Sequence, residues 1–365
     1  MKRIALITNH DDDVYCFRKE LLEELNKLGN KIIISCPYGE KLKLLNFDYE
    51  YDNPKINRRG TNPINDISLF LHYLRFINKY EPDIVLNYTI KPNIYASLAC
   101  RIKKVQYINN ITGLGSVLQK SKLLQALIYR LLKSAFKKSK CVFFQNETNM
   151  KLAISKGIVK QNYKLIPGSG VDVNRFPLQP YPKNNDKIVF NYIGRVLSEK
   201  GVDDYIEAAK TIKAKGYNTE FNIIGFIEPT EIHYEKEFKE LEKEKIIIYR
   251  GQQKDIRPFI KRAHAIIHPS KYGEGMSNVL LENAASGRPI ITTDNPGCRE
   301  TVVDGVTGYI YEMGNVDKLV SCIEKFISMT NKAKAEMGEL GRKKIEKEFN
   351  RKIVIEKYIK IIEAK

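Results

Sequence analysis

Seven residues separate two carboxylates, Glu274 and Glu282, in the stretch EGMSNVLLE. The apolar run 265–269 before this stretch is typical of a short buried strand, and residues 279–285 have apolar side chains at helical spacing. We therefore expect Glu274 in a strand-to-helix loop and Glu282 one to two turns into the helix. A helix N-terminus offers N–H groups and a partial positive charge that suit a phosphate. The carboxylates could accept hydrogen bonds from hydroxyls on either side of it, which a sugar nucleotide presents.

Two cations follow another apolar segment, at 188–193. Arg195 comes directly after Gly194, and Lys200 precedes Gly201 at the start of a helical pattern. The guanidinium of Arg195 can hold two phosphate oxygens, and Lys200 can add a point charge. Two surface charges near a turn are the alternative. The phosphate interpretation is favoured because the Glu274 loop is expected at the same edge of the sheet.

The next two expected strands also end in glycines, Gly225 and Gly251. Gly251 would let the backbone approach a flat ring, so a nucleobase could be recognised there by backbone groups. Asp255, four residues later, could cap the following helix. An ordinary turn with a capped helix explains these residues equally well, and both interpretations stay open.

Strand and helix signals alternate through both halves of the chain, which predicts parallel sheets covered by helices. Strands are expected at 4–8, 31–36, 84–88, 105–109, 141–145, 188–193, 221–224, 246–249, 265–269 and 289–293. Helices are expected at 17–28, 66–78, 93–101, 121–138, 202–214, 235–245, 256–262 and 279–285, with two or three more from Asp317 onward. This pattern predicts an α/β protein with two Rossmann-like domains and an active site in the cleft between them.

A proline-rich segment interrupts the alternation at 177–186 and predicts a linker. We place an N-terminal domain at 1–178, the linker at 179–187 and a C-terminal domain at 188–347. A last helix, 348–365, could pack back on the N-terminal domain.

The net charge of +18 is concentrated in the first half of the chain, where residues 1–180 carry +14. No acidic residue occurs between Asp83 and Glu147, whereas eleven cations do. Within this interval, Lys120–Lys140 combines an apolar stripe with flanking lysines, a pattern that suits a helix lying on an anionic membrane. A core helix with a solvated basic face is the alternative. A nucleic-acid partner fits poorly, because no helix-turn-helix, zinc or aromatic-stacking motif accompanies the charge.

Other features exclude several classes of protein. The six cysteines are scattered without a CxxC pair, which predicts reduced thiols and no zinc site. The N-terminal apolar run is too short for a signal peptide, and no run has the length of a transmembrane helix. We therefore expect a cytoplasmic protein that associates peripherally with the inner face of the cell membrane.

Several stretches of the second half together resemble the family-four retaining glycosyltransferases of the GT-B fold. The matching residues are Gly194-Arg195, Lys200-Gly201, Glu274-Gly275, Glu282-Asn283-Ala284, Gly287-Arg288-Pro289-Ile290, Gly297-Cys298-Arg299-Glu300 and Asp304-Gly305-Val306-Thr307-Gly308. They span almost the whole second domain. The element order of the first domain is compatible with the same family.

The resemblance implies that Arg195 and Lys200 bind the donor diphosphate, that Glu282 holds the ribose hydroxyls and that Glu274 faces the donor sugar. Glu274, Arg195 and Lys200 are the expected catalytic residues, with no cofactor. The further donor-binding residues are Gly194, Gly225, Gln252, Ile256, Gly275, Met276, Ser277, Asn278 and Val279.

The first domain departs from the family in two loops. Many relatives have a Gly-Gly loop after the first strand, where this chain has Asn9-His10-Asp11-Asp12-Asp13, and many have a histidine where this chain reads 109–115. The expected acceptor-binding residues are His10, Asp13, Arg18, Asn110 and Thr112. The aspartates also suggest a metal, but cations and a helix end already serve the diphosphate, so no metal is required. Capping of a helix over 14–28 is the other role open to His10 and the aspartates.

This form resembles a subgroup that transfers N-acetylhexosamines to undecaprenyl-diphosphate-linked sugars in bacterial capsule, O-antigen or glycan assembly. The resemblance implies a UDP-sugar donor and a lipid-linked saccharide acceptor. A UDP-sugar epimerase shares the two-domain architecture and the ligand class, and product analysis without an acceptor separates the two.

Overall fold

The computed structural model describes residues 1–57, 60, 62–114, 117, 121–183 and 187–364, and it divides the chain into two compact units. Unit 1 comprises Met1–Ser169 with Lys352–Lys365, and unit 2 comprises Gly170–Arg351. The division lies at Ser169, ahead of the proline-rich segment where the sequence placed a linker. Residues 184–186 of that expected linker are outside the described residues, and Pro177–Pro182 belongs to unit 2.

Among the described residues, unit 1 contains a seven-stranded parallel sheet with the order β3-β2-β1-β4-β5-β6-β7. Its strands are β1 (Arg3–Ile7), β2 (Lys31–Ser35), β3 (Tyr49–Asp52), β4 (Ile84–Tyr88), β5 (Gln106–Ile111), β6 (Cys141–Phe144) and β7 (Tyr163–Leu165). Its helices are α1 (Asp11–Phe17), α2 (Lys19–Lys27), α3 (Pro63–Tyr80), α4 (Ile90–Lys103), α6 (Lys122–Phe136), α7 (Glu147–Ser155) and α14 (Arg351–Glu363), with a 3₁₀ turn at Glu40–Leu44.

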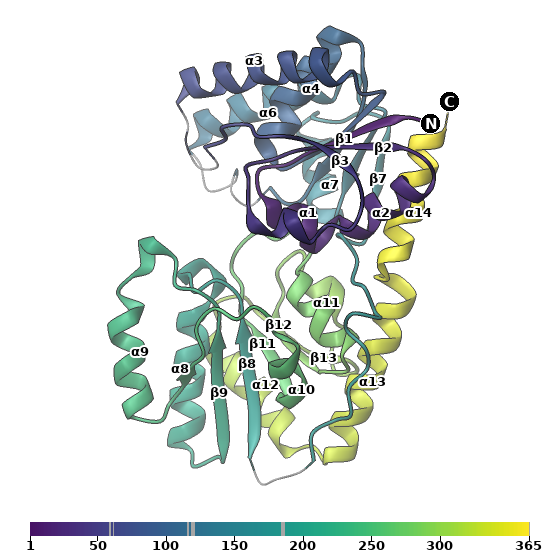
Figure 1. The fold of residues 1–365 in the computed structure, drawn as a ribbon. Coiled ribbons are helices and arrows are strands. Elements are labelled where there is room, and N and C mark those ends of the chain that lie inside the picture. Colours follow the sequence, from purple (N-terminus) through teal and green to yellow (C-terminus); the bar gives the residue numbers. More distant parts are fainter. Residues whose placement is uncertain (58–59, 61, 115–116, 118–120, 184–186, 365) are drawn as a thin grey trace. The chain divides into compact units, whose positions relative to one another are not determined.

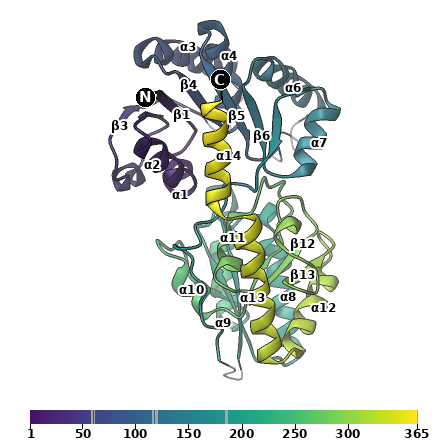
Figure 2. The same cartoon turned by 90° about the vertical axis from the view of Figure 1, so that its right-hand side faces the viewer.

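Alternating side chains of the central strands bury both faces of this sheet, as expected for a parallel sheet between helices. Ile4 and Leu6 face a core that α2 and the C-terminal helix α14 complete, whereas Ala5 and Ile7 face α3 and α4. Helices α3, α4 and α6 form one layer of unit 1, and α14 runs along the opposite face (Figures 1 and 2). The last helix therefore folds as part of the N-terminal unit.

The expected helix at 17–28 corresponds to α2, and a separate short helix, α1, precedes it. Helix α1 begins at Asp11 and ends at Phe17, and α2 begins at Lys19. Arg18 between them has a φ of −131° and leaves the helical conformation. The sequence carried no glycine or proline to mark this break, which is why the prediction missed it. The short strands β3 and β7 and helix α7 were also missed.

Unit 2 contains a six-stranded parallel sheet, within the described part of the chain, with the order β10-β9-β8-β11-β12-β13. Its strands are β8 (Ile188–Ile193), β9 (Thr219–Ile224), β10 (Ile248–Tyr249), β11 (Ala265–His268), β12 (Ile290–Thr293) and β13 (Gly308–Tyr311). Its helices are α8 (Val202–Ala214), α9 (Tyr234–Lys243), α10 (Arg257–Arg262), α11 (Asn278–Ala285), α12 (Val316–Ser328) and α13 (Asn331–Glu348). Three 3₁₀ turns lie at Ser198–Lys200, Pro229–Glu231 and Arg299–Thr301.

The sheet of unit 2 also separates two cores. Phe190 and Tyr192 of β8 pack with α8, α9 and α12, whereas Ile193 and Ile266 pack with α11 and α13. The expectation of two Rossmann-like units with parallel sheets is confirmed. Because every strand pairs in parallel, the carboxyl ends of the strands in each unit meet at one edge, where ligand sites of such sheets lie.

Candidate functional site

Two loops at the carboxyl edge of the unit 2 sheet bring Arg195, Lys200 and Glu274 together. The first connects β8 to α8 and carries both cations, and the second connects β11 to α11 and carries Glu274. Strands β8 and β11 are neighbours in the sheet, so their loops start side by side. The amide of Lys271 donates to Glu199 O at 2.9 Å and ties the two loops to each other. The predicted cluster therefore forms because β8 and β11 are neighbours in the sheet.

Two glycines allow this close approach. Gly201 has a φ of +76°, and a Cβ on it would lie 2.0 Å from the carbonyl oxygen of Pro269. Gly297 has a φ of +86°, and its Cβ would lie 2.7 Å from Cβ of Glu274. The Gly297 amide donates to Glu300 Oε2 at 2.7 Å, which holds the turn that supports Glu274. These contacts give a physical reason for the glycines in the motifs around Lys200 and Arg299.

An ion pair joins Lys200 Nζ to Glu274 Oε1, and both side chains are largely buried. The same carboxylate oxygen lies 3.4 Å from Ser270 Oγ and 3.9 Å from His268 Nε2. Burial opposes ionisation of Glu274, but Lys200, with smaller contributions from His268 and Arg195, holds its pKa below the ordinary value. Glu274 is therefore an ionised acceptor at neutral pH, able to receive a hydrogen bond from a sugar hydroxyl.

His268 was not predicted as a site residue, yet it lies directly behind Glu274 at the end of β11. Burial, with the charge of Lys200, lowers the pKa of His268 to about 4, so the ring is neutral at pH 7. Its Nε2 lies 3.2 Å from Oγ of Ser277 at the start of α11. The sequence indicated only that His268 ends a buried strand, and this position alone is weak evidence that a histidine belongs to a functional site.

Around the start of α11, the expected donor-binding residues Gly275, Met276, Ser277, Asn278 and Val279 follow Glu274 in the chain. The amide of Ser277 already donates to Gly297 O at 2.8 Å, and Met276 packs into the core. Asn278 and Val279 are the first residues of α11.

Glu282 lies in the second turn of α11 and is half-buried. Burial raises the pKa of Glu282 to about 7, against the opposing charges of Arg351 and Arg175. A carboxyl group that titrates near neutral pH in an interior position is characteristic of functional sites. This environment was not visible in the sequence, because Arg351 and Arg175 are distant from Glu282 along the chain.

The remaining expected donor residues lie at the ends of β9 and β10. A Cβ on Gly225 would lie 1.7 Å from the carbonyl oxygen of Gly194, so these two glycines mark the contact between neighbouring loops. Gln252 is exposed and Ile256 packs against the core. Asp255 accepts from the Arg257 amide at 3.0 Å at the start of α10, so the turn interpretation of this residue is the one that the structure supports.

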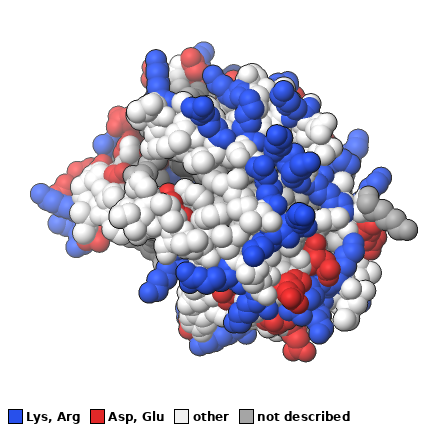
Figure 3. All heavy atoms as spheres, turned by 90° about the horizontal axis from the view of Figure 1, so that it is seen from above, with Lys and Arg blue, Asp and Glu red and all other residues white. Residues whose placement is uncertain are grey.

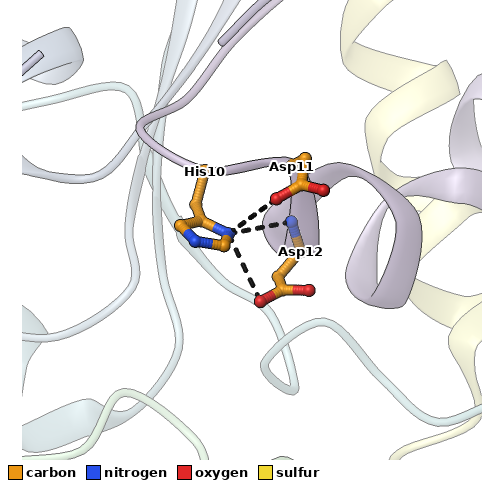
Figure 4. Close-up of side chains that lie close together, drawn as sticks. All are labelled: His10, Asp11 and Asp12. Atoms are coloured by element: carbon orange, nitrogen blue, oxygen red, sulfur yellow. Dashed lines mark hydrogen bonds and ion pairs between the residues drawn. The ribbon is translucent and has the colours of Figure 1, made fainter. Parts of the chain in front are cut away.

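In unit 1, His10 and the aspartates are engaged in local structure. His10 caps α1, accepting at Nδ1 from the Asp12 amide at 3.1 Å, and the same atom lies 3.0 Å from Asp11 Oδ1 (Figure 4). Lys41 pairs with Asp12 at 2.5 Å, and Asp13 accepts from Thr8 Oγ1 at 2.8 Å. Ligand atoms of His10, Asp11 and Asp12 lie within 4.8 Å of one another, close enough for a metal. Each of these groups has a protein partner in the structure.

The other expected acceptor residues are mostly interior. Arg18 is buried with its guanidinium 4.4 Å from the ring centre of Tyr88, and Asn110 is buried and donates to the Tyr358 hydroxyl. Asn110 therefore helps to seat α14 on the sheet, whereas Arg18 packs on a residue of β4. Thr112 is half-buried just after β5, and residues 115, 116 and 118–120 of the following segment are outside the described residues.

The whole chain is similar to known glycosyltransferases. Residues 175–344 match the family described as Glycosyl transferases group 1, and residues 3–146 match Glycosyl transferase 4-like. The capsular polysaccharide biosynthesis glycosyltransferase CapM of Staphylococcus aureus is 27% identical, over 92% of this chain and 90% of CapM. An N,N'-diacetylbacillosaminyl-diphospho-undecaprenol alpha-1,3-N-acetylgalactosaminyltransferase of Campylobacter jejuni is 24% identical, over 84% of each chain.

Solved structures give the same result for the fold. HepE of Anabaena, in complex with UDP and glucose, has a TM-score of 0.82 and 15% identity, over 99% of both chains. A glycosyltransferase from Rickettsia africae has a TM-score of 0.81 and 21% identity, over 100% of this chain and 99% of that one. With both family matches and this fold, the chain belongs to the group 1, family-four-like glycosyltransferases of GT-B architecture.

Proposed function

We propose that the protein transfers a sugar, an N-acetylhexosamine, from a UDP-sugar to a saccharide linked to undecaprenyl diphosphate, with retention of the anomeric configuration. The process would be assembly of a bacterial capsule, O-antigen or related glycan. The observation that carries the proposal is the charge cluster of Arg195, Lys200 and Glu274 at the carboxyl edge of the unit 2 sheet. The Campylobacter relative, an N-acetylgalactosaminyltransferase that acts on a diphospho-undecaprenol-linked sugar, supports the transferred sugar and the acceptor class. The Staphylococcus relative, a capsular polysaccharide glycosyltransferase, supports the process.

The charges of this cluster fit a leaving diphosphate. As the bond between the anomeric carbon and the phosphate oxygen breaks, negative charge develops on the diphosphate, where Arg195 and Lys200 would stabilise it. Stabilisation of developing charge by fixed groups is often the largest catalytic contribution, and these cations supply it without a metal ion. Glu274 would accept a hydrogen bond from a donor sugar hydroxyl, and Glu282 from the ribose.

In the reaction that we propose, the acceptor hydroxyl attacks the anomeric carbon on the face that UDP leaves. A glycosidic bond forms, the bond to the phosphate oxygen breaks, and the acceptor proton passes to the leaving phosphate oxygen. No separate general base is then needed. Neutral His268 and ionised Glu274 suit this scheme, since Glu274 serves as an acceptor beside the sugar and needs no proton of its own.

The variant Arg195→Ala tests the donor assignment. We expect turnover to fall by about 10²–10³-fold, the range seen when one charge-stabilising donor is removed from an active site. Circular dichroism and the melting temperature should stay close to those of the unchanged protein, because the Arg195 side chain is 37% exposed. Arg257→Ala, which removes an exposed arginine from α10, is the matched control. Near-normal turnover in Arg195→Ala would contradict the assignment.

We also propose that the layer formed by α3, α4 and α6 contacts an anionic membrane. Leu132, Ala135 and Phe136 of α6 are buried, but Leu123 and Leu127 are 84% and 52% exposed. The apolar stripe therefore packs inward at the end of the helix and faces outward near its start. Lys120, the first residue of the expected basic segment, lies outside the described residues.

Neighbouring helices extend this surface. Ile64, Ile67 and Leu71 of α3 and Ile102 of α4 are exposed, and so are Lys103 at the end of α4, Lys104 after it and Lys138 after α6. A shallow groove of about 700 Å³ beside them is lined by Phe70, Leu98, Arg101, Ile102, Lys104 and Lys138, among others. Seen from above, Lys and Arg gather in a broad band among uncharged atoms (Figure 3). None of the described helices is long and apolar enough to cross a membrane.

Vesicle flotation tests the membrane surface. Each cation near an anionic surface contributes about 1 kcal/mol, so Lys133→Gln/Lys137→Gln should weaken binding to phosphatidylserine vesicles by roughly tenfold or more. Lys236→Gln/Lys239→Gln removes the same charge from exposed positions of α9 in unit 2 and should leave binding unchanged. Equal binding to neutral and anionic vesicles, or binding to DNA in preference to vesicles, would contradict the proposal.

A further inference from the structure

We propose that Glu228 is a positioning residue that fixes the guanidinium of Arg195 in the orientation needed to receive the donor diphosphate. The inference rests on the proposed role of Arg195 and adds a residue to which neither the motifs nor the resemblance assigned a role. Glu228 Oε1 lies 2.5 Å from Arg195 Nη1. The side chain of Glu228 is 12% exposed and that of Arg195 is 37% exposed.

The backbone delivers Glu228 to this position. Strands β8 and β9 continue to pair beyond their ends, because Gly194 N donates to Ile224 O and Val196 N donates to Phe226 O, each at 2.9 Å. The amide of Glu228 then donates to Val196 O at 3.2 Å. This extension of the sheet includes Arg195 and holds the Glu228 backbone in register with it.

Gly225 makes the extended pairing possible. A side chain there would meet the carbonyl oxygen of Gly194, and the φ of +151° is one that other residues rarely adopt. The Tyr192 hydroxyl also donates to Arg195 O at 2.8 Å, so the Arg195 backbone is fixed as well. With both backbones fixed, the ion pair limits the remaining freedom of the long Arg195 side chain.

A carboxylate beside a diphosphate site needs a physical reason, because its charge repels the ligand. The reason that we infer is orientation. An arginine side chain loses rotamer entropy when it binds a ligand, and a partner that holds one guanidinium nitrogen removes much of that cost in advance. The planar guanidinium, held through Nη1 by the less exposed Glu228, keeps its more exposed part available for phosphate oxygens.

Two simpler roles for Glu228 make different predictions. As a purely structural ion pair, it would affect folding and would act independently of Arg195 in ligand binding. As a purely electrostatic neighbour, it would weaken binding of an anion, so removal of its charge would strengthen UDP binding. A positioning role requires that its effect on UDP binding disappear when Arg195 is absent.

The test is a double-mutant cycle on UDP affinity, measured by calorimetry with the full-length protein. We expect Glu228→Ala to weaken UDP binding about tenfold, and Glu228→Asp to do the same because its carboxylate no longer reaches Nη1. Glu228→Gln, which keeps an acceptor oxygen at the same reach, should stay within about threefold of the unchanged protein. Arg195→Ala/Glu228→Ala should bind UDP no more weakly than Arg195→Ala. Glu235→Ala, at an exposed position of α9, is the control.

The possible results distinguish an error in the role of Glu228 from an error in the donor assignment of Arg195. If Arg195→Ala weakens UDP binding but Glu228→Ala adds a further loss on top of it, the positioning role is wrong and the donor assignment stands. Tighter UDP binding by both Glu228→Gln and Glu228→Asp would also overturn the positioning role. If Arg195→Ala itself leaves UDP affinity unchanged, the donor assignment is wrong, and the role of Glu228 falls with it.

Discussion

At the scale of single residues, Glu282 and Glu274 occupy opposite electrostatic environments within one stretch of chain. Lys200 lies against Glu274 and holds its pKa down, whereas burial raises the pKa of Glu282 to about 7. The same residue type thus has two protonation behaviours, set by what surrounds each carboxyl group. The sequence predicted both carboxylates as site residues. It could not show that their pKa values shift in opposite directions, because the residues around each carboxyl group come from other segments.

The raised pKa of Glu282 predicts a pH dependence of stability. Between about pH 4.5 and pH 7 the folded protein keeps a proton on Glu282 that the unfolded chain has lost, so this group contributes less to stability as pH rises. In urea titrations, the unchanged protein should lose about 1–2 kcal/mol relative to Glu282→Gln between pH 4.5 and pH 8. This is less than the whole pKa difference gives at 1.36 kcal/mol per unit, because Glu282 is only half-buried.

The matched control for this prediction is Glu235→Gln, at an exposed position of α9. Its stability difference from the unchanged protein should be nearly the same at both pH values. A difference for Glu282→Gln that stays constant from pH 4.5 to pH 8 would show that Glu282 ionises as an ordinary surface carboxyl group. A difference that grows in the opposite direction would show that folding lowers the pKa of Glu282, and either result would contradict the prediction.

At the scale of elements, the close packing of loops at the carboxyl edge depends on Gly225. Gly225→Ala would place a Cβ 1.7 Å from the Gly194 carbonyl oxygen and force the loops after β8 and β9 apart. We expect a loss of about 2–4 kcal/mol in the free energy of unfolding and at least tenfold weaker UDP binding. Calorimetric UDP titrations and urea unfolding at pH 7 measure the two effects.

Gly216→Ala isolates the backbone contribution. Gly216 has a φ of +80° at the end of α8, but a Cβ there has open space around it. This variant should lose only about 1 kcal/mol, the cost of a left-handed non-glycine residue, and should bind UDP normally. Equal effects of the two substitutions would mean that conformational freedom alone, and not contact with Gly194, explains Gly225.

Arg288 shows how a motif residue can be structural. It is 1% exposed, and its guanidinium donates to the carbonyl oxygens of Ile260 at 2.9 Å and Pro180 at 2.8 Å. It thereby fastens the proline-rich segment to the rest of unit 2. This observation explains why the segment that reads as a linker in the sequence belongs to a compact unit.

Arg288→Lys should destabilise the protein by about 2–4 kcal/mol, because an ammonium group cannot reach both carbonyl oxygens and leaves buried acceptors unpaired. Urea unfolding measures this loss, and Arg257→Lys at an exposed position is the control. At temperatures where the variant is folded, UDP affinity should be unchanged. A stability loss below about 0.5 kcal/mol would contradict the structural role of Arg288.

The elements that the sequence predicted best are those with strong periodicity and clear ends. Strands β4 and β8 and helix α8 have the expected bounds. Glycine or proline lies near their ends, or an unbroken apolar run defines the strand. The break at Arg18 was not predictable, because no glycine or proline marks it and the partner of Arg18, Tyr88, lies far along the chain. Likewise, Asn110 reads as a polar loop residue, but Tyr358 from the far end of the chain covers it.

At the scale of the whole molecule, the order of strands does most to build the site. Residues in the loops after β8, β9 and β11 come together because β8 is central, with β9 on one side and β11 on the other. The sequence could indicate that each loop carried a polar or glycine residue. It could not reveal contacts such as Glu228 with Arg195, which depend on pairing beyond the strand ends.

The reaction that we propose for the whole molecule is transfer of a sugar from a UDP-sugar to a lipid-linked acceptor with retention. The most direct measurement is incubation of the protein with a panel of UDP-sugars and undecaprenyl-diphosphate-linked saccharides, followed by mass spectrometry and NMR of the new linkage. We expect UDP release that depends on the acceptor, one added N-acetylhexosamine and an α linkage from an α-configured donor. An isomerised or hydrolysed UDP-sugar without acceptor, or a β linkage from the same donor, would contradict it.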